Sequence, residues 1–86
     1  MFVLVLKEYV MKQLSDIKIG QKATVLKVNG NGALKRRIMD MGVTKGAEVF
    51  ITKTAPLGDP LEINVRGYQL TIRKDDAKTI LVKEMD

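Results

Sequence analysis

The sequence of 86 residues has no cysteine, no histidine and no tryptophan. Without cysteine, the chain can form no disulfide, no zinc–thiolate site and no iron–sulfur cluster, and it has no thiol nucleophile. Without histidine, it has no imidazole base, no serine–histidine–aspartate triad and no two-histidine iron site. These absences exclude most enzyme and metalloprotein classes open to a small domain, so we expect no catalytic residue, no metal site and no cofactor.

Aromatic residues and apolar runs are also scarce. The four aromatic residues are Phe2, Tyr9, Phe50 and Tyr68, too few for the stacking platform on which single-stranded nucleic acids are held. The apolar run over residues 2–6 is far shorter than the roughly 20 residues of a membrane-spanning helix or the about 7–15 of a signal-peptide core. We therefore expect a cytoplasmic protein without direct membrane insertion.

The charge is moderately basic, with 15 lysines and arginines against 10 acidic residues, a net charge of +5. Such a balance favours acidic partners, although an ordinary solvated surface is the better explanation. Met11 followed by Lys12 resembles a second start of the chain. We predict that residues 1–10 are an N-terminal extension, either an extra strand or disordered, and that residues 11–86 form a single domain. Self-association through the apolar run at residues 2–6 is a further hypothesis.

Alternation of apolar and polar residues predicts short strands, and one segment has helical spacing instead. In that segment, residues 33–41, the apolar Leu34, Ile38 and Met41 share one helix face, with Asn31 as N-cap and Gly42 beyond the end. The predicted strands cover residues 21–28, 47–54, 61–66, 68–73 and 79–83. The fold class is therefore mostly β: a small five-stranded antiparallel barrel of SH3 or OB type with one short helix after the first strand.

The loop at residues 55–60, Ala-Pro-Leu-Gly-Asp-Pro, differs from the other connections because it holds both prolines of the chain. Proline at Pro56 and Pro60 stiffens the backbone, and Gly58 allows a conformation that other residues avoid. Leu57 and Asp59 then present one apolar and one acidic side chain from a rigid loop, which suits recognition of a partner. A turn whose leucine covers one end of the barrel is an equally good interpretation.

The basic run of the predicted helix is a second candidate contact. Lys35, Arg36 and Arg37 lie opposite the apolar face, where they can contact phosphate or an acidic partner. The simpler interpretation is the polar face of an amphipathic helix.

These segments together resemble the ferrous-iron transport protein A family (FeoA). The resemblance rests first on the loop at residues 55–60. It is supported, in order along the chain, by Leu-Ser-Asp-Ile-Lys-Ile-Gly-Gln at residues 14–21, the helix-then-glycine segment at 34–46, and the segments at 67–73 and 77–82. It covers residues 11 to about 84, nearly the whole chain.

The resemblance implies an SH3-like barrel and a cytoplasmic accessory role in prokaryotic ferrous-iron uptake. The implied partner is the membrane transporter of that system with its GTP-binding domain, which would hold the protein at the inner face of the membrane. The predicted partner-binding residues are Pro56, Leu57, Gly58, Asp59, Pro60, Lys35, Arg36 and Arg37.

Two alternatives remain at the level of sequence. One is a basic barrel that binds nucleic acid, which the scarcity of aromatic residues disfavours, so that no nucleic acid is expected. The other is a weak iron-binding chaperone. Without histidine or cysteine, its ligands would be carboxylates, carbonyls and thioethers, a poor set for holding ferrous iron.

Overall fold

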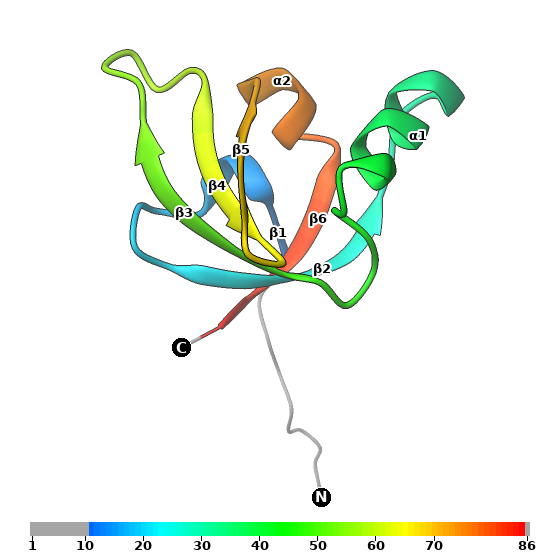
Figure 1. The fold of residues 1–86 in the computed structure, drawn as a ribbon, viewed down its shortest axis with the longest axis horizontal. Coiled ribbons are helices and arrows are strands. Elements are labelled where there is room, and N and C mark those ends of the chain that lie inside the picture. Colours follow the sequence, from blue (N-terminus) through cyan, green and yellow to red (C-terminus); the bar gives the residue numbers. More distant parts are fainter. Residues whose placement is uncertain (1–10, 86) are drawn as a thin grey trace, which may run out of the picture.

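The structure, a computed structural model, describes residues 11–85. One sheet of antiparallel strands, in the order β1-β6-β2-β3-β4-β5, curls around the core (Figure 1). The elements in chain order are β1 (Met11–Gln13), the 3-10 helix η1 (Leu14–Asp16), β2 (Lys22–Val28), α1 (Gly32–Asp40), β3 (Glu48–Thr54), β4 (Leu61–Val65), β5 (Tyr68–Ile72), α2 (Lys74–Ala77) and β6 (Ile80–Met85). The predicted extension at residues 1–10 lies outside the described residues.

The mostly β architecture with a short helix is confirmed, but the described residues form six strands where five were predicted. The additional strand is β1, which pairs with β6 at one edge of the sheet. Three residues are too few to show an alternating pattern, so only pairing with β6 reveals the strand. As a consequence, α1 follows the second strand of the chain rather than the first.

The core is formed by apolar side chains that alternate with exposed ones along the strands. In β4, for example, Leu61, Ile63 and Val65 are buried, as the alternation predicts. The other buried side chains are Leu14, Ile17, Ala23, Val25, Val28, Ile38, Val43, Ala47, Val49, Ile51, Ile72, Ala77, Ile80 and Val82. All of them are apolar, so the fold is held chiefly by removal of apolar surface from water.

Helix α1 covers one end of this core, to the right of the sheet in Figure 1. Its N-terminus is capped as predicted, because the Asn31 side chain accepts a hydrogen bond from the Leu34 backbone N–H at 2.9 Å. Ile38 is fully buried, and Leu34 and Met41 pack against the core as partly buried side chains. Gly42 follows with φ +95°, the left-handed conformation that ends a helix.

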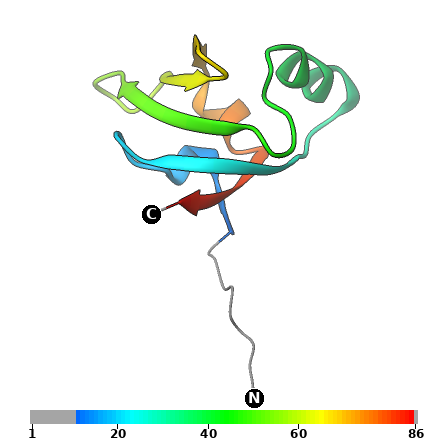
Figure 2. The same ribbon diagram turned by 60° about the horizontal axis from the view of Figure 1, so that its bottom comes forward.

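Bulges and a tight turn help to curl the sheet, which Figure 2 shows from below. The pairing register shifts at Leu26 in β2 and at Thr52 in β3, and such bulges increase the local twist. Arg66 and Gly67 connect β4 and β5 with φ values of 53° and 86°. Two central residues with positive φ form the turn that matches the twist of a two-residue hairpin. This hairpin places β5 at the second edge of the sheet.

Candidate functional site: the proline-flanked loop and the basic helix

The loop between β3 and β4 is closed by its own backbone. The Ala55 N–H donates to the Pro60 carbonyl at 3.0 Å, and the Gly58 N–H donates to the Ala55 carbonyl at 2.7 Å. The second bond makes residues 55–58 a turn with Pro56 at the position where its fixed φ is favourable. Gly58 has φ +86°, and a Cβ added there would meet no neighbouring atom. Its role is therefore conformational.

Leu57 lies at the tip of this turn and is 94% exposed. The alternative in which this side chain covers one end of the barrel is therefore wrong. The turn carries a large apolar side chain almost wholly in water, which is the arrangement expected for a contact residue.

Asp59 connects the loop to the helix α2. Its Oδ1 accepts a hydrogen bond from the Lys74 backbone N–H at 2.9 Å. Arg73, the N-cap residue of α2, provides no side-chain acceptor, so Asp59 satisfies an N-terminal N–H of α2 from a distant part of the chain. The carboxylate predicted as a partner contact thus also fixes the base of the loop.

The three basic residues of α1 are exposed, as predicted. The Arg37 Nη2 lies 3.5 Å from the Asp76 Oδ2, which joins α1 to α2 through a charged hydrogen bond. No ion pair among the described residues involves Lys35 or Arg36, so their charges are directed to solvent.

The loop and the basic helix lie on opposite sides of α2, as both ribbon views show (Figure 1, Figure 2). The structure therefore does not bring Leu57 and the basic run together as the lining of one groove. Helix α2 contacts each of them separately, through Asp59 on one side and Arg37 on the other. The predicted residues therefore form two separate patches, with α2 between them.

A groove that sequence reasoning missed lies between α1 and the edge strand β5. Its volume is about 450 Å³, and it is lined by Arg37, Met41, Thr71, Ile72, Arg73 and Asp76. These residues come from two segments about 30 positions apart, and no local pattern in the sequence indicates that they meet.

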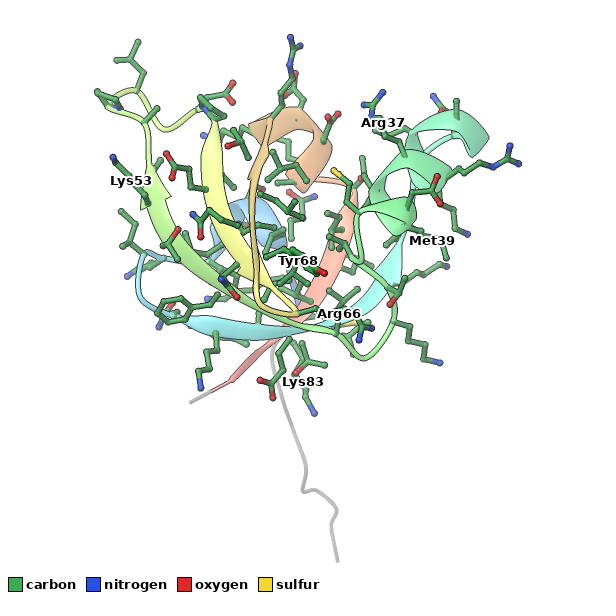
Figure 3. All side chains as sticks on the ribbon, viewed as in Figure 1. Arg37, Met39, Lys53, Arg66, Tyr68 and Lys83 are labelled. Carbon is green, nitrogen blue, oxygen red and sulfur yellow. The ribbon has the colours of Figure 1, made fainter. Side chains whose placement is uncertain are left out.

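Arg66 anchors the turn between β4 and β5 through its side chain. Its Nε donates to the Gly42 carbonyl at 3.1 Å, and its Nη2 donates to the Thr44 Oγ1 at 2.9 Å. The Gly42 carbonyl lies just beyond the end of α1, where backbone acceptors have no partner within the helix. Arg66 therefore ties the β4–β5 hairpin to the connection between α1 and β3 (Figure 3).

The ion pair between Lys12 and Glu84 lowers the pKa of the glutamate. The Lys12 Nζ lies 2.8 Å from the Glu84 Oε1 and links β1 to β6. Its hydrogen bond to the carboxylate holds the pKa of Glu84 below the usual value, because the bond favours the charged form. The pair stabilises the edge strand that the sequence did not predict.

The described residues contain neither a cluster of metal ligands nor a helix that could span a membrane. Within residues 11–85, no three side chains of histidine, cysteine, aspartate or glutamate lie close enough together to hold a metal ion. In the same part of the chain, none of the helices has the length and apolar character needed to cross a membrane.

A sequence model of the FeoA domain matches residues 12–84. The chain belongs to the FeoA family. This confirms the resemblance based on the loop and on the order of the surrounding segments, and it associates the domain with ferrous-iron transport.

Solved structures confirm the SH3-like fold of this FeoA domain. An FeoA-like protein from Clostridium acetobutylicum is 38% identical, with 88% of each chain covered and a TM-score of 0.83. FeoA from Stenotrophomonas maltophilia, described as an SH3 domain protein and solved in complex with zinc, is 32% identical. That similarity covers 80% of this chain and 86% of the other, with a TM-score of 0.72.

A longer relative combines FeoA with a transporter. The fusion protein of Fe(2+) transport protein A and Fe(2+) transporter FeoB from Porphyromonas gingivalis is 32% identical over 71 residues. The similarity covers 83% of this chain but only 8% of the fusion protein. This FeoA domain thus corresponds to a small part of a chain that also contains FeoB.

Proposed function

We propose that this FeoA domain is an interaction module that binds the cytoplasmic part of a ferrous-iron transporter of the FeoB type. The observation that carries the proposal is the relative in which FeoA and FeoB form one chain. Two domains joined in one chain meet at a high effective concentration, so fusion favours a function that depends on contact between them. The partner surface includes the GTP-binding domain, and ferrous iron is the cargo of the transporter. The domain works in the cytoplasm at the inner face of the membrane.

Leu57 is the apolar anchor of the proposed contact. Its side chain is 94% exposed on a loop whose backbone is already closed by two hydrogen bonds. A preformed loop loses little conformational freedom when it binds, so more of the contact energy appears as affinity. Burial of a leucine side chain contributes about 1.5–3 kcal/mol, which corresponds to a roughly ten- to hundredfold change in affinity.

The basic face of α1 provides the electrostatic part of the contact. Lys35 and Arg36 are exposed and have no acidic partner among the described residues. Charges at the rim of an interface steer association and add dependence on salt, while contributing little to affinity. An acidic surface on the transporter would meet this face, on the other side of α2 from the Leu57 loop.

A titration of the detergent-solubilised transporter with fluorescently labelled domain tests the proposal. We expect saturable binding that Leu57→Ser weakens by about tenfold or more, since serine removes the apolar anchor. The matched control is Ile19→Ser, because Ile19 is also an exposed aliphatic residue, 59% accessible, in the turn before β2. Absence of binding would contradict the proposed function, and equal losses in the two variants would contradict the assignment of Leu57.

A further inference from the structure

Strand β5 forms an open edge of the sheet. Its one partner among the described strands is β4, with Val65 opposite Tyr68 next to the turn. In a two-residue hairpin the closing pair exchanges backbone hydrogen bonds, and so does every second pair after it. Gln69, opposite Asn64, and Thr71, opposite Glu62, lie between the hydrogen-bonded pairs. Their backbone N–H and C=O groups therefore point away from β4. No hydrogen bond of residues 11–85 engages those backbone groups.

The end of this edge strand, at Thr71 and Ile72, lines the groove between β5 and α1. The pair of Arg37 and Asp76 fixes two of the lining side chains. The hydrogen bonds of Arg66 to Gly42 and Thr44 hold the hairpin that carries β5 against the connection after α1. Its volume of about 450 Å³ lies in the range of binding pockets in proteins. Exposed strand edges pair readily with another chain unless they are covered, and here an unpaired edge lies beside a preformed space.

The lining of the groove is basic. It contains the guanidinium groups of Arg37 and Arg73 but only one carboxylate, that of Asp76, which already pairs with Arg37. Arg73 is exposed and forms no salt bridge with any described residue. A carboxylate from outside would therefore find an unpaired guanidinium at the end of β5.

We propose that this groove binds an extended, acidic peptide segment of a partner protein, which adds to the sheet as a strand beside β5. The backbone of the segment pairs with Gln69 and Thr71, and an aspartate or glutamate side chain meets Arg73. Strand addition obtains affinity from main-chain hydrogen bonds and specificity from side chains along the strand. None of the residues that line the groove belongs to the Leu57 loop, so this inference goes beyond the proposed function and does not depend on it.

The first test is an NMR titration of the ¹⁵N-labelled domain with a blocked eight-residue peptide that alternates valine and glutamate. We expect saturable shifts of the amide signals of Gln69 and Thr71, and slower hydrogen exchange at Thr71. A peptide with lysine in place of glutamate should bind at least tenfold more weakly. A peptide N-methylated on alternate residues should lose the protection of Thr71, because it cannot pair as a strand.

The matched variants are Arg73→Glu and Lys53→Glu, which change the charge equally. Lys53 lies on β3, on the side of the sheet away from α1 (Figure 3). We expect Arg73→Glu to weaken binding of the acidic peptide at least tenfold and Lys53→Glu to leave it within twofold. The inference is overturned if β5 signals do not shift at millimolar peptide, if the lysine peptide binds equally well, or if shifts are confined to the Leu57 loop. Concentration-dependent shifts of β5 without peptide would also overturn it in favour of a second copy of this chain.

Discussion

Asp59→Ala tests whether the acid of the proline-flanked loop is part of the folded framework. The substitution removes the acceptor of the hydrogen bond from the Lys74 N–H, 2.9 Å long, which joins the loop to α2. Loss of a side-chain cap from a helix N-terminus typically costs about 1 kcal/mol, within a range of roughly 0.5–2. For a domain of this size, about 1 kcal/mol lowers the midpoint of thermal unfolding by roughly 4–8 °C.

The assay is urea unfolding followed by circular dichroism, with Asp59→Asn as the control. Asparagine keeps the acceptor oxygen and caps helices about as well as aspartate, so its free energy of unfolding should lie within about 0.5 kcal/mol of wild type. If Asp59→Ala unfolds at the same urea concentration as wild type, the hydrogen bond makes no net contribution and the loop is not fixed by it.

Three further substitutions probe the core, the hairpin and the first strand. Ile38→Ala should lower the free energy of unfolding by about 2–4 kcal/mol, because truncation of this fully buried side chain leaves a cavity under α1. A loss below about 1 kcal/mol in urea unfolding would contradict this packing. Gly67→Ala should lower the free energy of unfolding by about 1 kcal/mol in the same assay. No neighbouring atom blocks a Cβ at this position, but its φ of +86° disfavours residues that have one. An unchanged urea midpoint would contradict this conformational cost. Lys12→Met should raise the pKa of Glu84 toward its usual value in an NMR pH titration. Because the pKa is lowered in the folded wild type, the pair stabilises the fold above the usual pKa of Glu84, and this stabilisation is lost as the pH falls through the lowered value. If the pKa of Glu84 stays the same in Lys12→Met, the pair with Lys12 does not lower it.

Elements with a local sequence signal were predictable. Alternation over Leu61, Ile63 and Val65 gives the strand and its buried face, and the spacing of Leu34 and Ile38 gives the helix and the side that packs. These elements can be predicted because apolar residues recur about every 2.0 residues in a half-buried strand and about every 3.6 residues in a helix.

Features that depend on distant segments were not predictable. Strand β1 is too short for a periodic pattern and is defined by its pairing with β6. Likewise, nothing near Asp59 in the chain indicates that its carboxylate binds the Lys74 N–H. The groove beside Arg73 also arises only because the sheet curls and brings β5 next to α1. For the candidate site, the sequence indicated the loop residues as candidates, but it could not show that Leu57 is exposed or that α2 separates the loop from the basic helix.

Ferrous-iron uptake by transporter-containing vesicles is the most direct test of the claim that this FeoA domain acts on the transporter through the Leu57 loop. The measurement compares uptake without the domain, with wild type, with Leu57→Ser and with Ile19→Ser, each variant first shown to unfold at the wild-type urea concentration. We expect wild type and Ile19→Ser to change the uptake rate equally, whereas Leu57→Ser should leave the rate near that measured without the domain. An uptake rate that is the same with Leu57→Ser as with wild type, or that never responds to the domain, would contradict an action through the Leu57 loop.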